Sequence, residues 1–342
     1  MHVSIAGAGI IGLSIAWRLA RAGCRVTVRD AGRVASQASW AGAGMLAPGG
    51  EYHTDSPWTR LAVQSLAQYE GFVADLAAAS GVPIDFRVSG ALELAFSDGE
   101  RRLLARPRPE GVPVEEVTAA SVRYFAPVPA VGVLGARWFP NEAVVDPRNV
   151  CAALLAACQA LGVEIREEDP LVRCDGPTVV AAGAWSSQIA GLEAAPRAYP
   201  VKGHLLGYRC PPESLPPIVR HGHHYALQRN NGFTIFGSDE QPGVWDATAE
   251  PDRIAALADA AAKLLPRLLD RPPDQVWAGL RPQSEAQSPV VERLPGADTW
   301  LAYGHFRNGI LLAPITADLV AASILHDTGL RLTEAPATPE KG

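Results

Sequence analysis

Hydrophobic and polar residues follow two alternating patterns at the beginning of the chain. Residues 2–6 are a short apolar run, residues 13–22 carry apolar side chains at helical intervals, and residues 25–30 are a second apolar run. Short apolar runs between turn residues are typical of buried strands, whereas the period of 3.6 residues is typical of a helix. The sequence therefore predicts a strand, a tight turn at 7–12, a helix ending before Gly23 and a second strand.

The same two patterns recur along the rest of the chain. They predict further helices at residues 59–80, 146–161, 252–269 and 314–326. They predict strands at residues 91–96, 178–182 and 299–303, and strand-like alternation over 199–239 with turns at 230–232 and 241–243. The helix at 146–161 has the clearest ends, because Asp146 can cap it, Pro147 suits its first position and Gly162 can stop it.

The order of these elements predicts an α/β protein in which one domain is discontinuous in sequence. Short buried strands followed by helices or turns occur in three separate stretches, residues 1–80, 145–198 and 283–330. Sheet-like material occupies residues 81–144 and 199–282. We therefore predict a doubly wound, Rossmann-like domain with an inserted antiparallel-sheet α+β substrate domain. Residues 331–342 are rich in proline and are predicted to form a loosely ordered tail.

Composition and charge exclude several classes of partner. Of the 342 residues, 48% are hydrophobic, and 30 Lys and Arg stand against 36 Asp and Glu, with no basic run that would neutralise a phosphate backbone. Residues 3–16 are uncharged like a signal sequence, but no basic segment precedes them and glycines interrupt them. No other apolar run is long enough to cross a bilayer. We expect a soluble, cytoplasmic protein that binds neither nucleic acid nor membrane.

Cysteine and tryptophan patterns predict packing roles. The five cysteines are odd in number and lack both C-x-x-C spacing and a histidine partner at zinc-site distance, so we expect reduced thiols. Cys151 and Cys158 lie two turns apart on a predicted helix, which is the spacing of a shared buried face. For Trp40 and Trp245 a packing role is expected over a role in shaping a pocket, because packing is the commoner role of tryptophan.

His221, His223 and His224 form the one cluster in the sequence that suggests a metal site. Alternating strand geometry would put His221 and His223 on one face, but no third ligand lies nearby in sequence. We therefore predict no metal, and expect these histidines at a strand edge or lining a cavity.

The first turn has the spacing of a dinucleotide-binding motif. Gly7, Gly9 and Gly12 follow a predicted strand and open a helix, and Asp30 ends the next strand. The first glycine permits the tight turn, the second lets backbone approach a pyrophosphate, and the third allows close packing of the helix. Asp30 would accept hydrogen bonds from the adenosine ribose, which disfavours the 2′-phosphate of NADP. FAD and NAD share this motif, and a glycine-rich turn without a ligand is the remaining alternative.

Two other segments favour FAD over NAD. Residues 38–48 are rich in alanine and glycine, which suits a broad ring that needs close approach to the backbone. Residues 304–312 place backbone donors just before the last predicted helix. A reduced flavin carries negative charge near N1 and O2, and the N–H groups at a helix start stabilise such charge.

At these residues the chain resembles the glycine oxidases of the FAD-dependent D-amino-acid oxidase superfamily. The resemblance spans nearly the whole chain and is strongest at residues 39–48, 181–186, 200–203, 277–282 and 304–314. Sarcosine oxidases of this superfamily attach flavin through a late cysteine, whereas the last cysteine here is Cys210. The resemblance therefore implies non-covalent FAD. The residues that it and the glycine motif assign to FAD are Gly7, Gly9, Ile10, Ile11, Gly12, Asp30, Ala31, Ala38, Ser39, Ala43, Gly44, Met45, Leu171, Ala182, Gly183, Trp185, His305, Phe306, Asn308, Gly309, Ile310 and Leu311.

Three residues are candidates for binding a substrate carboxylate. Arg281 and Arg307 are chosen because a guanidinium offers paired donors to a carboxylate and stays charged in a confined site. Tyr225 would add a neutral donor. In the resemblance all three positions match carboxylate-binding residues, whereas an isolated arginine without that context would more simply form a surface ion pair.

The resemblance implies oxidation of glycine or another small amino acid to an imine, hydrolysis to the 2-oxo acid and ammonia, and reoxidation of the flavin by molecular oxygen to hydrogen peroxide. Hydride transfer needs alignment more than a protein base, so no catalytic acid or base is assigned. The resemblance also implies a homo-oligomer and a role in making the thiazole of thiamine. Three alternatives stay open: an oxidase of sarcosine, D-amino acids or an N-substituted glycine; a dehydrogenase that reduces a quinone or carrier; and a non-catalytic flavoprotein.

Overall fold

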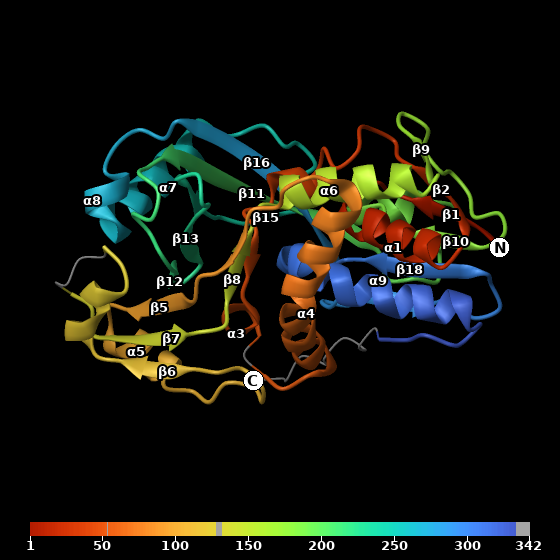
Figure 1. The fold of residues 1–342 in the computed structure, drawn as a ribbon. Helices are drawn as coiled ribbons and strands as arrows, with labels where there is room; N and C mark the ends of the chain where they lie inside the picture. Colours follow the sequence, from red (N-terminus) through yellow and green to blue (C-terminus); the bar gives the residue numbers. More distant parts are fainter. Residues whose placement is uncertain (53, 128–131, 333–342) are drawn as a thin grey trace.

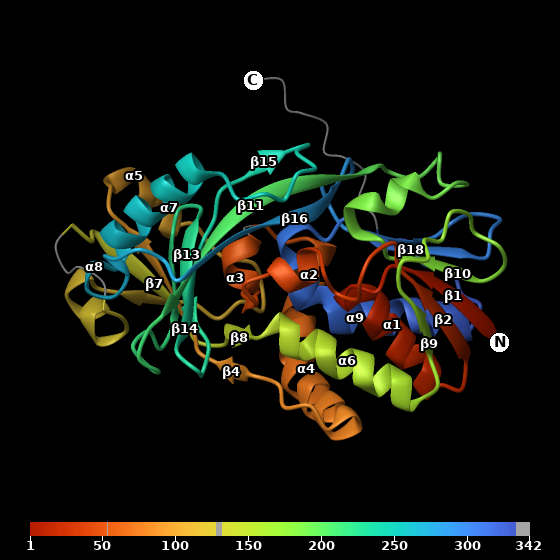
Figure 2. The same cartoon turned by 90° about the horizontal axis from the view of Figure 1, so that it is seen from above.

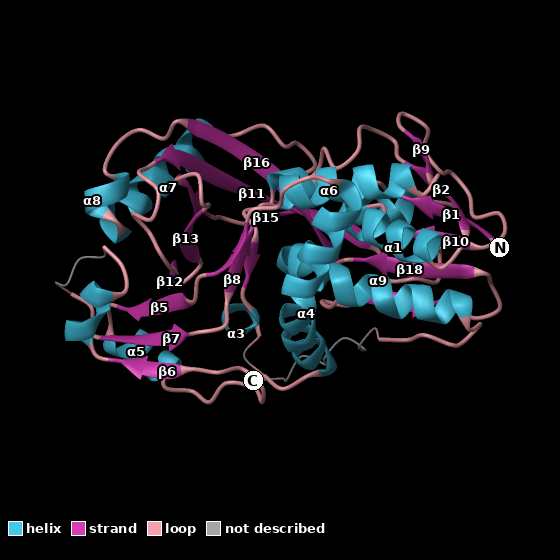
Figure 3. Ribbon diagram, in the orientation of Figure 1, coloured by secondary structure: helices cyan, strands magenta, loops and turns pink. Residues whose placement is uncertain are grey.

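The computed structural model describes residues 1–52, 54–127 and 132–332. Helices and strands occur together in both halves of the molecule (Figure 3). Two long strands, β11 (Ala198–Arg209) and β16 (Gln275–Ser284), run side by side from one half toward the other (Figure 2). The two predicted types of substructure are therefore present, and β11 and β16 join them.

The first substructure is a mainly parallel sheet of six strands within the described residues, in the order β17-β18-β10-β1-β2-β9. Its strands are β1 (His2–Ala6), β2 (Arg25–Arg29), β9 (Glu164–Arg166), β10 (Thr178–Val180), β17 (Val290–Arg293) and β18 (Thr299–Tyr303). Only β17 runs antiparallel to its neighbour among these six described strands. All six come from the three stretches predicted to form the discontinuous Rossmann-like domain, and this confirms the predicted fold class.

Helices cover one face of this sheet. The packed helices are α1 (Ile10–Arg21), α4 (Pro57–Ser80), α6 (Pro147–Ala160) and α9 (Gly309–Leu325) (Figure 1). Their apolar side chains form one buried cluster with those of β1 and β2. The opposite face is covered by the 3₁₀ helix η2 (Gly183–Gln188) and the segment that follows it. The carboxyl ends of the parallel strands stay open toward β11 and β16.

The second substructure is a mainly antiparallel sheet of nine strands within the described residues. Besides β11 and β16 it contains β5 (Ala91–Ala95), β6 (Glu115–Val117), β7 (Gly135–Phe139), β12 (Ile218–His221), β13 (His224–Gln228), β14 (Phe233–Gly237) and β15 (Gln241–Pro242). The helices that accompany it are α5 (Asp98–Leu104), α7 (Pro251–Leu264), α8 (Pro266–Leu269) and the 3₁₀ helix η1 (Ala119–Tyr124). The division of the chain into two domains at the sequence-based boundaries stays a prediction.

Small elements fill the junction between the two large sheets. They are a sheet of β3 (Met45–Leu46), β4 (Phe86–Val88) and β8 (Ala143–Val145), the helices α2 (Ala38–Ala41) and α3 (Pro48–Glu51), and the 3₁₀ helix η3 (Phe306–Asn308). The small-residue segment at 38–48 therefore lies at the junction because its glycines and alanines permit close packing. Gly44 has a φ of +94°, and a Cβ there would collide with the carbonyl oxygen of Val145.

Helix ends follow their local signals where capping residues are present. Asp146 accepts a hydrogen bond from the N–H of Arg148 at 2.9 Å, Pro147 opens α6, and Gly162 has a φ of +74° just beyond its end. The predicted helix at 252–269 is instead broken into α7 and α8, with Leu265 as a non-helical residue before Pro266. A proline at that position disfavours helical geometry in the residue before it.

The last helix differs from its prediction. It begins at Gly309 instead of residue 314, with Pro314 inside it. Proline has no N–H to donate to the carbonyl four residues earlier, that of Ile310. The buried hydroxyl of Tyr69 donates to this carbonyl at 3.2 Å, and Ser65 donates to the next one, Leu311, at 2.6 Å. Side chains of α4 therefore donate hydrogen bonds to carbonyl groups of α9 at the turn where proline removes a backbone bond.

The structure corrects the geometry expected for the histidine cluster. His221 ends β12 and His224 begins β13, so Gly222 and His223 form a two-residue hairpin turn, not part of a continuous strand. Gly222 has a φ of +56°, which such a turn requires. His221 contacts Glu100 at 3.0 Å. Among the described residues no group of three metal-ligating side chains is assembled.

The five cysteines are free thiols, and Cys151 and Cys158 share the buried face of α6 as predicted. Leu332 donates its N–H to Val291 at 3.0 Å, so the first residues of the predicted tail attach to β17, while 333–342 lie outside the described residues. The segment Phe306–Leu325 is apolar and long enough to span a membrane, contrary to the sequence prediction, but 67% of its most apolar 18-residue window is buried inside the protein.

Candidate functional site

A cavity of about 520 Å³ lies where the carboxyl ends of the parallel strands meet β11 and β16. Ligands of open α/β sheets bind at this edge. The cavity brings together nearly all the residues that the sequence assigned to a site. The predicted residues that border it are Gly7, Gly9, Ile10, Ile11, Asp30, Ala31, Ala38, Ser39, Ala43, Gly44, Met45, Leu171, Ala182, Gly183, Trp185, Tyr225, Arg281, His305, Phe306, Arg307, Gly309 and Ile310.

Three of the residues assigned to FAD do not border the cavity in the described structure. Gly12 packs beneath the turn, where a Cβ would collide with the carbonyl oxygen of Gly7. Leu311 is buried in the helical core, because the first turn of α9 directs it toward α1 and α4. Asn308 is the residue before α9, and its N–H bonds to the carbonyl of His305 at 2.9 Å. These three residues shape the glycine turn and the start of α9 without lining the cavity.

The glycine turn has the geometry that a pyrophosphate requires. Gly7 has a φ of +101°, and a Cβ there would collide with the carbonyl of Ala181 at the end of β10. The N–H of Ile10 at the start of α1 points to the hydroxyl of Ser39, at 3.0 Å. The first turn of α1 contains no acidic residue. The positive end of the α1 dipole therefore favours an anion at this point.

Asp30 is fixed at the end of β2 by two backbone N–H groups. Its Oδ2 accepts from Ala8 at 2.7 Å and its Oδ1 accepts from Gly32 at 2.8 Å. Because each carboxylate oxygen has a second lone pair, Asp30 retains the capacity to accept from ribose hydroxyls. The adenosine end of a dinucleotide thus fits beside Asp30, with Leu171 on the same part of the cavity wall.

The opposite end of the cavity suits an uncharged or anionic ring. Gly309 and Ile310, which begin α9, border it together with His305. Burial lowers the pKa of His305 from its ordinary value to about 3, and the ring contacts the Thr316 hydroxyl at 3.1 Å. His305 is therefore neutral at physiological pH. The positive end of the α9 dipole is left as the source of stabilisation for negative charge on a ring.

Buried His305 makes stability depend on pH. Because its folded pKa is depressed to about 3 from 6.5, the unfolded state binds a proton first as the pH falls. Above its unfolded pKa, His305 does not lower the free energy of unfolding. Between pH 6.5 and 3 it lowers that free energy progressively. We expect the apoprotein to lose about 2 kcal/mol of unfolding free energy at pH 5 relative to pH 8 through this group.

Urea unfolding of His305→Gln apoprotein at both pH values measures the effect. The variant is expected to lose less stability between pH 8 and pH 5 than the unmodified protein. His326→Gln is the matched control, because His326 is exposed just beyond the same helix. An equal loss in all three proteins would contradict a role for His305.

Arg281 lies on β16 with its guanidinium against the neighbouring strand. Nη2 donates to the Ser238 hydroxyl at 2.7 Å and Nη1 donates to the Asp239 carbonyl at 3.2 Å. The guanidinium occupies the space where a side chain of Gly203 would otherwise stand. Burial lowers the pKa of Arg281, but an arginine stays charged. Among the described residues, no carboxylate forms an ion pair with Arg281.

Arg307 is paired with two carboxylates, which the sequence did not predict. Its Nε lies 3.0 Å from Glu51 of α3, and its Nη1 lies 3.3 Å from Glu240 beyond β14. Burial alone would lower the pKa of Arg307, but the charges of Glu51 and Glu240 outweigh it and raise the pKa. Arg307 therefore carries a largely compensated charge.

Tyr225 of β13 completes this end of the cavity. Burial raises the pKa of its hydroxyl, so the group is a neutral donor, and it is hydrogen-bonded to Ser238. The sequence analysis did not assign several lining residues to the site, although Gly42, Gly203 and Gly279 lie in segments that carry the family resemblance and Glu51 closely follows the small-residue segment. The polar or glycine lining residues that were not assigned are Arg29, Gly32, Gln37, Gly42, Glu51, Gln188, Gly203, Ser238 and Gly279.

The two tryptophans considered from sequence lie outside the cavity wall. Trp40 is 44% exposed and packs edge-on against Trp277, with the guanidinium of Arg148 over its ring at 4.0 Å. Trp245 packs edge-on against Trp185, which does border the cavity. Both therefore have packing roles, as expected.

Comparison with known proteins follows from this geometry. A family model described as FAD dependent oxidoreductase (DAO) matches residues 2–323. The chain belongs to the DAO family of FAD-dependent oxidoreductases. It is 34% identical to the glycine oxidase of Bacillus licheniformis over 94% of this chain and 92% of that protein. The crystal structure of glycine oxidase from Geobacillus kaustophilus superposes with a TM-score of 0.88 at 28% identity, covering 99% of both chains.

A third relative of this DAO-family chain is a bifunctional protein. The chain is 31% identical to the bifunctional protein ThiO/ThiG of a Nostoc species, over 95% of this chain and 52% of that protein. Family membership confirms FAD as the cofactor and the choice of FAD over NAD. The start of α1, the fixed carboxylate of Asp30 and the start of α9 fit the pyrophosphate, the ribose and the flavin ring respectively.

Proposed function

We propose that this chain oxidises glycine and other small amino acids with FAD and molecular oxygen, giving the 2-oxo acid, ammonia and hydrogen peroxide. The observation that supports this most directly is Arg281. It borders a confined cavity beside the ring end of the FAD site, and no ion pair with a carboxylate compensates it among the described residues. A substrate with one carboxylate and a small body fits that arrangement.

The side chains at the substrate end would act by binding and orienting. Arg281 would take the substrate carboxylate with paired donors, and Tyr225 would add a neutral hydroxyl donor. Bound FAD supplies the chemistry, because its flavin ring accepts the hydride of the substrate α-carbon. Burial between β11, β16 and α9 excludes water from the reacting bond, which strengthens both contacts. The imine formed leaves with its nitrogen, and water hydrolyses it.

The lining residues named above are proposed as the FAD and substrate contacts of this enzyme. Gly203 and Gly279 border the cavity, and neither position has room for a side chain, since a Cβ on Gly203 would collide with Arg281 and one on Gly279 with Ala41. We further propose a cytoplasmic homo-oligomer without nucleic-acid or membrane partners. The likeness to glycine oxidases and to ThiO/ThiG supports a role in supplying the glycine imine for the thiazole of thiamine.

The compensated charge of Arg307 predicts selection against a second carboxylate. Glu51 and Glu240 already form ion pairs with its guanidinium, which leaves little attraction for a further carboxylate. Glu51→Gln removes one of the two charges that compensate Arg307, and we expect it to raise kcat/KM for iminodiacetate relative to glycine by about tenfold. Steady-state peroxide release with both substrates measures the ratio.

Glu240→Gln is the matched control, because its carboxylate is 37% exposed whereas that of Glu51 is 11% exposed. Water screens the more exposed partner, so its removal is expected to change the ratio less. An unchanged ratio in Glu51→Gln would show that Arg307 does not set this selectivity.

An anaerobic flavin-bleaching screen tests the proposed function. Glycine, sarcosine, D-alanine and D-proline are mixed in turn with the FAD-loaded enzyme, and loss of the oxidised flavin band is timed. Fast bleaching by glycine supports the proposal. If only a larger amine bleaches the flavin fast, that amine and not glycine is the substrate. No bleaching by any amine would favour a non-catalytic flavoprotein. Peroxide yield per turnover in air separates an oxidase from a dehydrogenase.

A further inference from the structure

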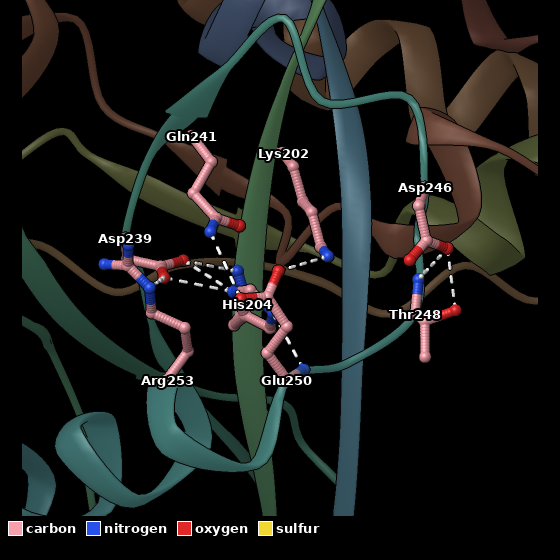
Figure 4. Close-up of polar contacts among 8 residues, drawn as sticks. All are labelled: Lys202, His204, Asp239, Gln241, Asp246, Thr248, Glu250 and Arg253. Carbon is pink, nitrogen blue, oxygen red and sulfur yellow. Dashed lines mark hydrogen bonds and ion pairs between the residues drawn. The ribbon is translucent and has the colours of Figure 1, made fainter.

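Buried His204 and partly exposed Asp239 form a hydrogen-bonded pair behind the substrate end of the cavity (Figure 4). His204 lies on β11 and is fully buried, and Asp239 follows β14. Nδ1 of the imidazole lies 3.0 Å from each carboxylate oxygen of Asp239. The backbone N–H of His204 also donates to Asp239 Oδ1 at 2.7 Å. The strand and the loop are therefore joined by side chain and backbone at once.

A third contact fixes the tautomer of His204. The backbone N–H of Glu250, just before α7, donates to Nε2 of His204 at 3.1 Å. Because Nε2 accepts, Nδ1 must carry the proton in the neutral ring and donate it to Asp239. Burial alone would raise the pKa of Asp239, but the hydrogen bonds from His204 outweigh it and lower the pKa. The pair is thus a neutral imidazole held by a carboxylate.

Polar and charged side chains surround this pair and fix the residues that contact it. Lys202, which is 1% exposed, donates to Glu250 at 2.7 Å, and Gln241 donates to the other oxygen of Glu250 at 3.3 Å. Arg253 on α7 lies 3.9 Å from Asp239. Figure 4 shows these side chains converging on His204 from β11, the loop after β14 and the start of α7. The donor and the acceptor of His204 both have fixed partners.

The same loop holds Arg281 through different atoms. The carbonyl of Asp239 accepts from Nη1 of Arg281, and the hydroxyl of Ser238 accepts from Nη2. Gly203, which precedes His204 on β11, borders the cavity beneath the guanidinium, and successive residues of a strand face opposite sides. Asp239 therefore connects the two sides, with its carboxylate on His204 and its carbonyl on Arg281.

We propose that His204 and Asp239 are positioning residues that hold the 238–239 backbone in place, so that Arg281 meets the substrate carboxylate in a fixed orientation. This inference rests on the proposed role of Arg281 as the carboxylate-binding residue. Neither His204 nor Asp239 borders the cavity, so neither touches substrate or FAD. Their effect is on the affinity for the carboxylate.

Two replacements of His204 separate its two hydrogen bonds. In His204→Asn the amide nitrogen stands near the position of Nδ1 and still donates to Asp239. In His204→Gln the amide reaches the position of Nε2 and serves Glu250 instead. We expect His204→Gln to weaken binding of acetate to the FAD-loaded enzyme about tenfold, and His204→Asn to retain most of it, since the lost bond is one to a charged group. The shift of the visible flavin spectrum on titration with acetate measures the affinity.

A second readout separates positioning from general destabilisation. His204→Gln and Asp239→Asn are expected to raise KM for glycine about tenfold with little change in kcat. For glycinamide, which has no carboxylate, kcat/KM is expected to stay within about twofold. A loss of stability alone would lower the amount of active enzyme for both substrates equally. Flavin content per protein confirms that each sample is fully loaded.

The outcomes decide between this inference and the proposed function. Wild-type acetate affinity in both His204→Gln and Asp239→Asn would overturn the positioning role, as would equal effects in His204→Gln and His204→Asn. If His204→Gln does not accumulate with FAD, Asp239→Asn gives the decisive titration. If Arg281→Lys also leaves acetate affinity unchanged, the assignment of Arg281 fails, and the positioning role fails with it.

Discussion

Replacing Arg281 with alanine is expected to raise KM for glycine by about 100-fold or more, while the protein still purifies with FAD. Truncating one partner of a desolvated, hydrogen-bonded charge pair costs several kcal/mol, because the substrate carboxylate then lies in the cavity without compensation. Arg307 does not replace it, since Glu51 and Glu240 already pair with that guanidinium. Steady-state kinetics and the flavin-to-protein absorbance ratio measure both parts of the result.

Arg281→Lys and a second substrate sharpen this test. Lysine retains the charge without the paired, planar donors, so we expect a KM between those of the unmodified enzyme and the alanine variant. Glycinamide lacks the carboxylate, and its kcat/KM should fall far less in Arg281→Ala. Loss of FAD from the alanine variant would contradict the assignment, because Arg281 would then support the cofactor. An unchanged KM would move the carboxylate site elsewhere.

Local signals in the sequence predicted the elements that depend on local interactions. The helix at 147–160 was placed within a residue at each end because Asp146, Pro147 and Gly162 act on their own neighbours. The start of α9 was placed five residues late, because Pro314 was interpreted as a helix start. The hydroxyl of Tyr69, 241 residues before Ile310 in the chain, donates to the Ile310 carbonyl that proline leaves free. No local pattern could show this.

The candidate site divides in the same way. Most residues of the glycine turn and of the small-residue segment could be assigned to the cavity from sequence. Glycine and alanine are the residue types that allow a tight turn and close approach of the backbone. The ion pairs of Arg307 depend on Glu51 and Glu240, which reach it only when α3 and the β14–β15 loop are packed beside η3. The histidine cluster was misplaced because a two-residue hairpin turn was interpreted as continuous strand. Pairing across distant elements is a property of the fold.

Gly7→Ala is expected to give a folded protein without FAD. At a φ of +101° any L side chain costs about 1–2 kcal/mol of strain, and here the new Cβ would also collide with the Ala181 carbonyl. Relief of that collision requires the turn to move away from β10, and the turn carries the backbone that approaches the pyrophosphate. Because a displacement of this kind misaligns the donors at the start of α1, cofactor affinity falls more than stability.

Gly23→Ala provides the matched control, because it has the same backbone cost without the collision. Gly23 has a φ of +83° just beyond the other end of α1, and a Cβ there has no heavy atom within 4 Å. Both variants should therefore lose similar stability from strain, but only Gly7→Ala should lose flavin absorbance. Thermal melting of the apoproteins compares the strain, and FAD titration compares the affinity. Equal FAD affinity in the two variants would mean that the turn at Gly7 does not approach the cofactor, and the dinucleotide site would have to lie elsewhere along the cavity.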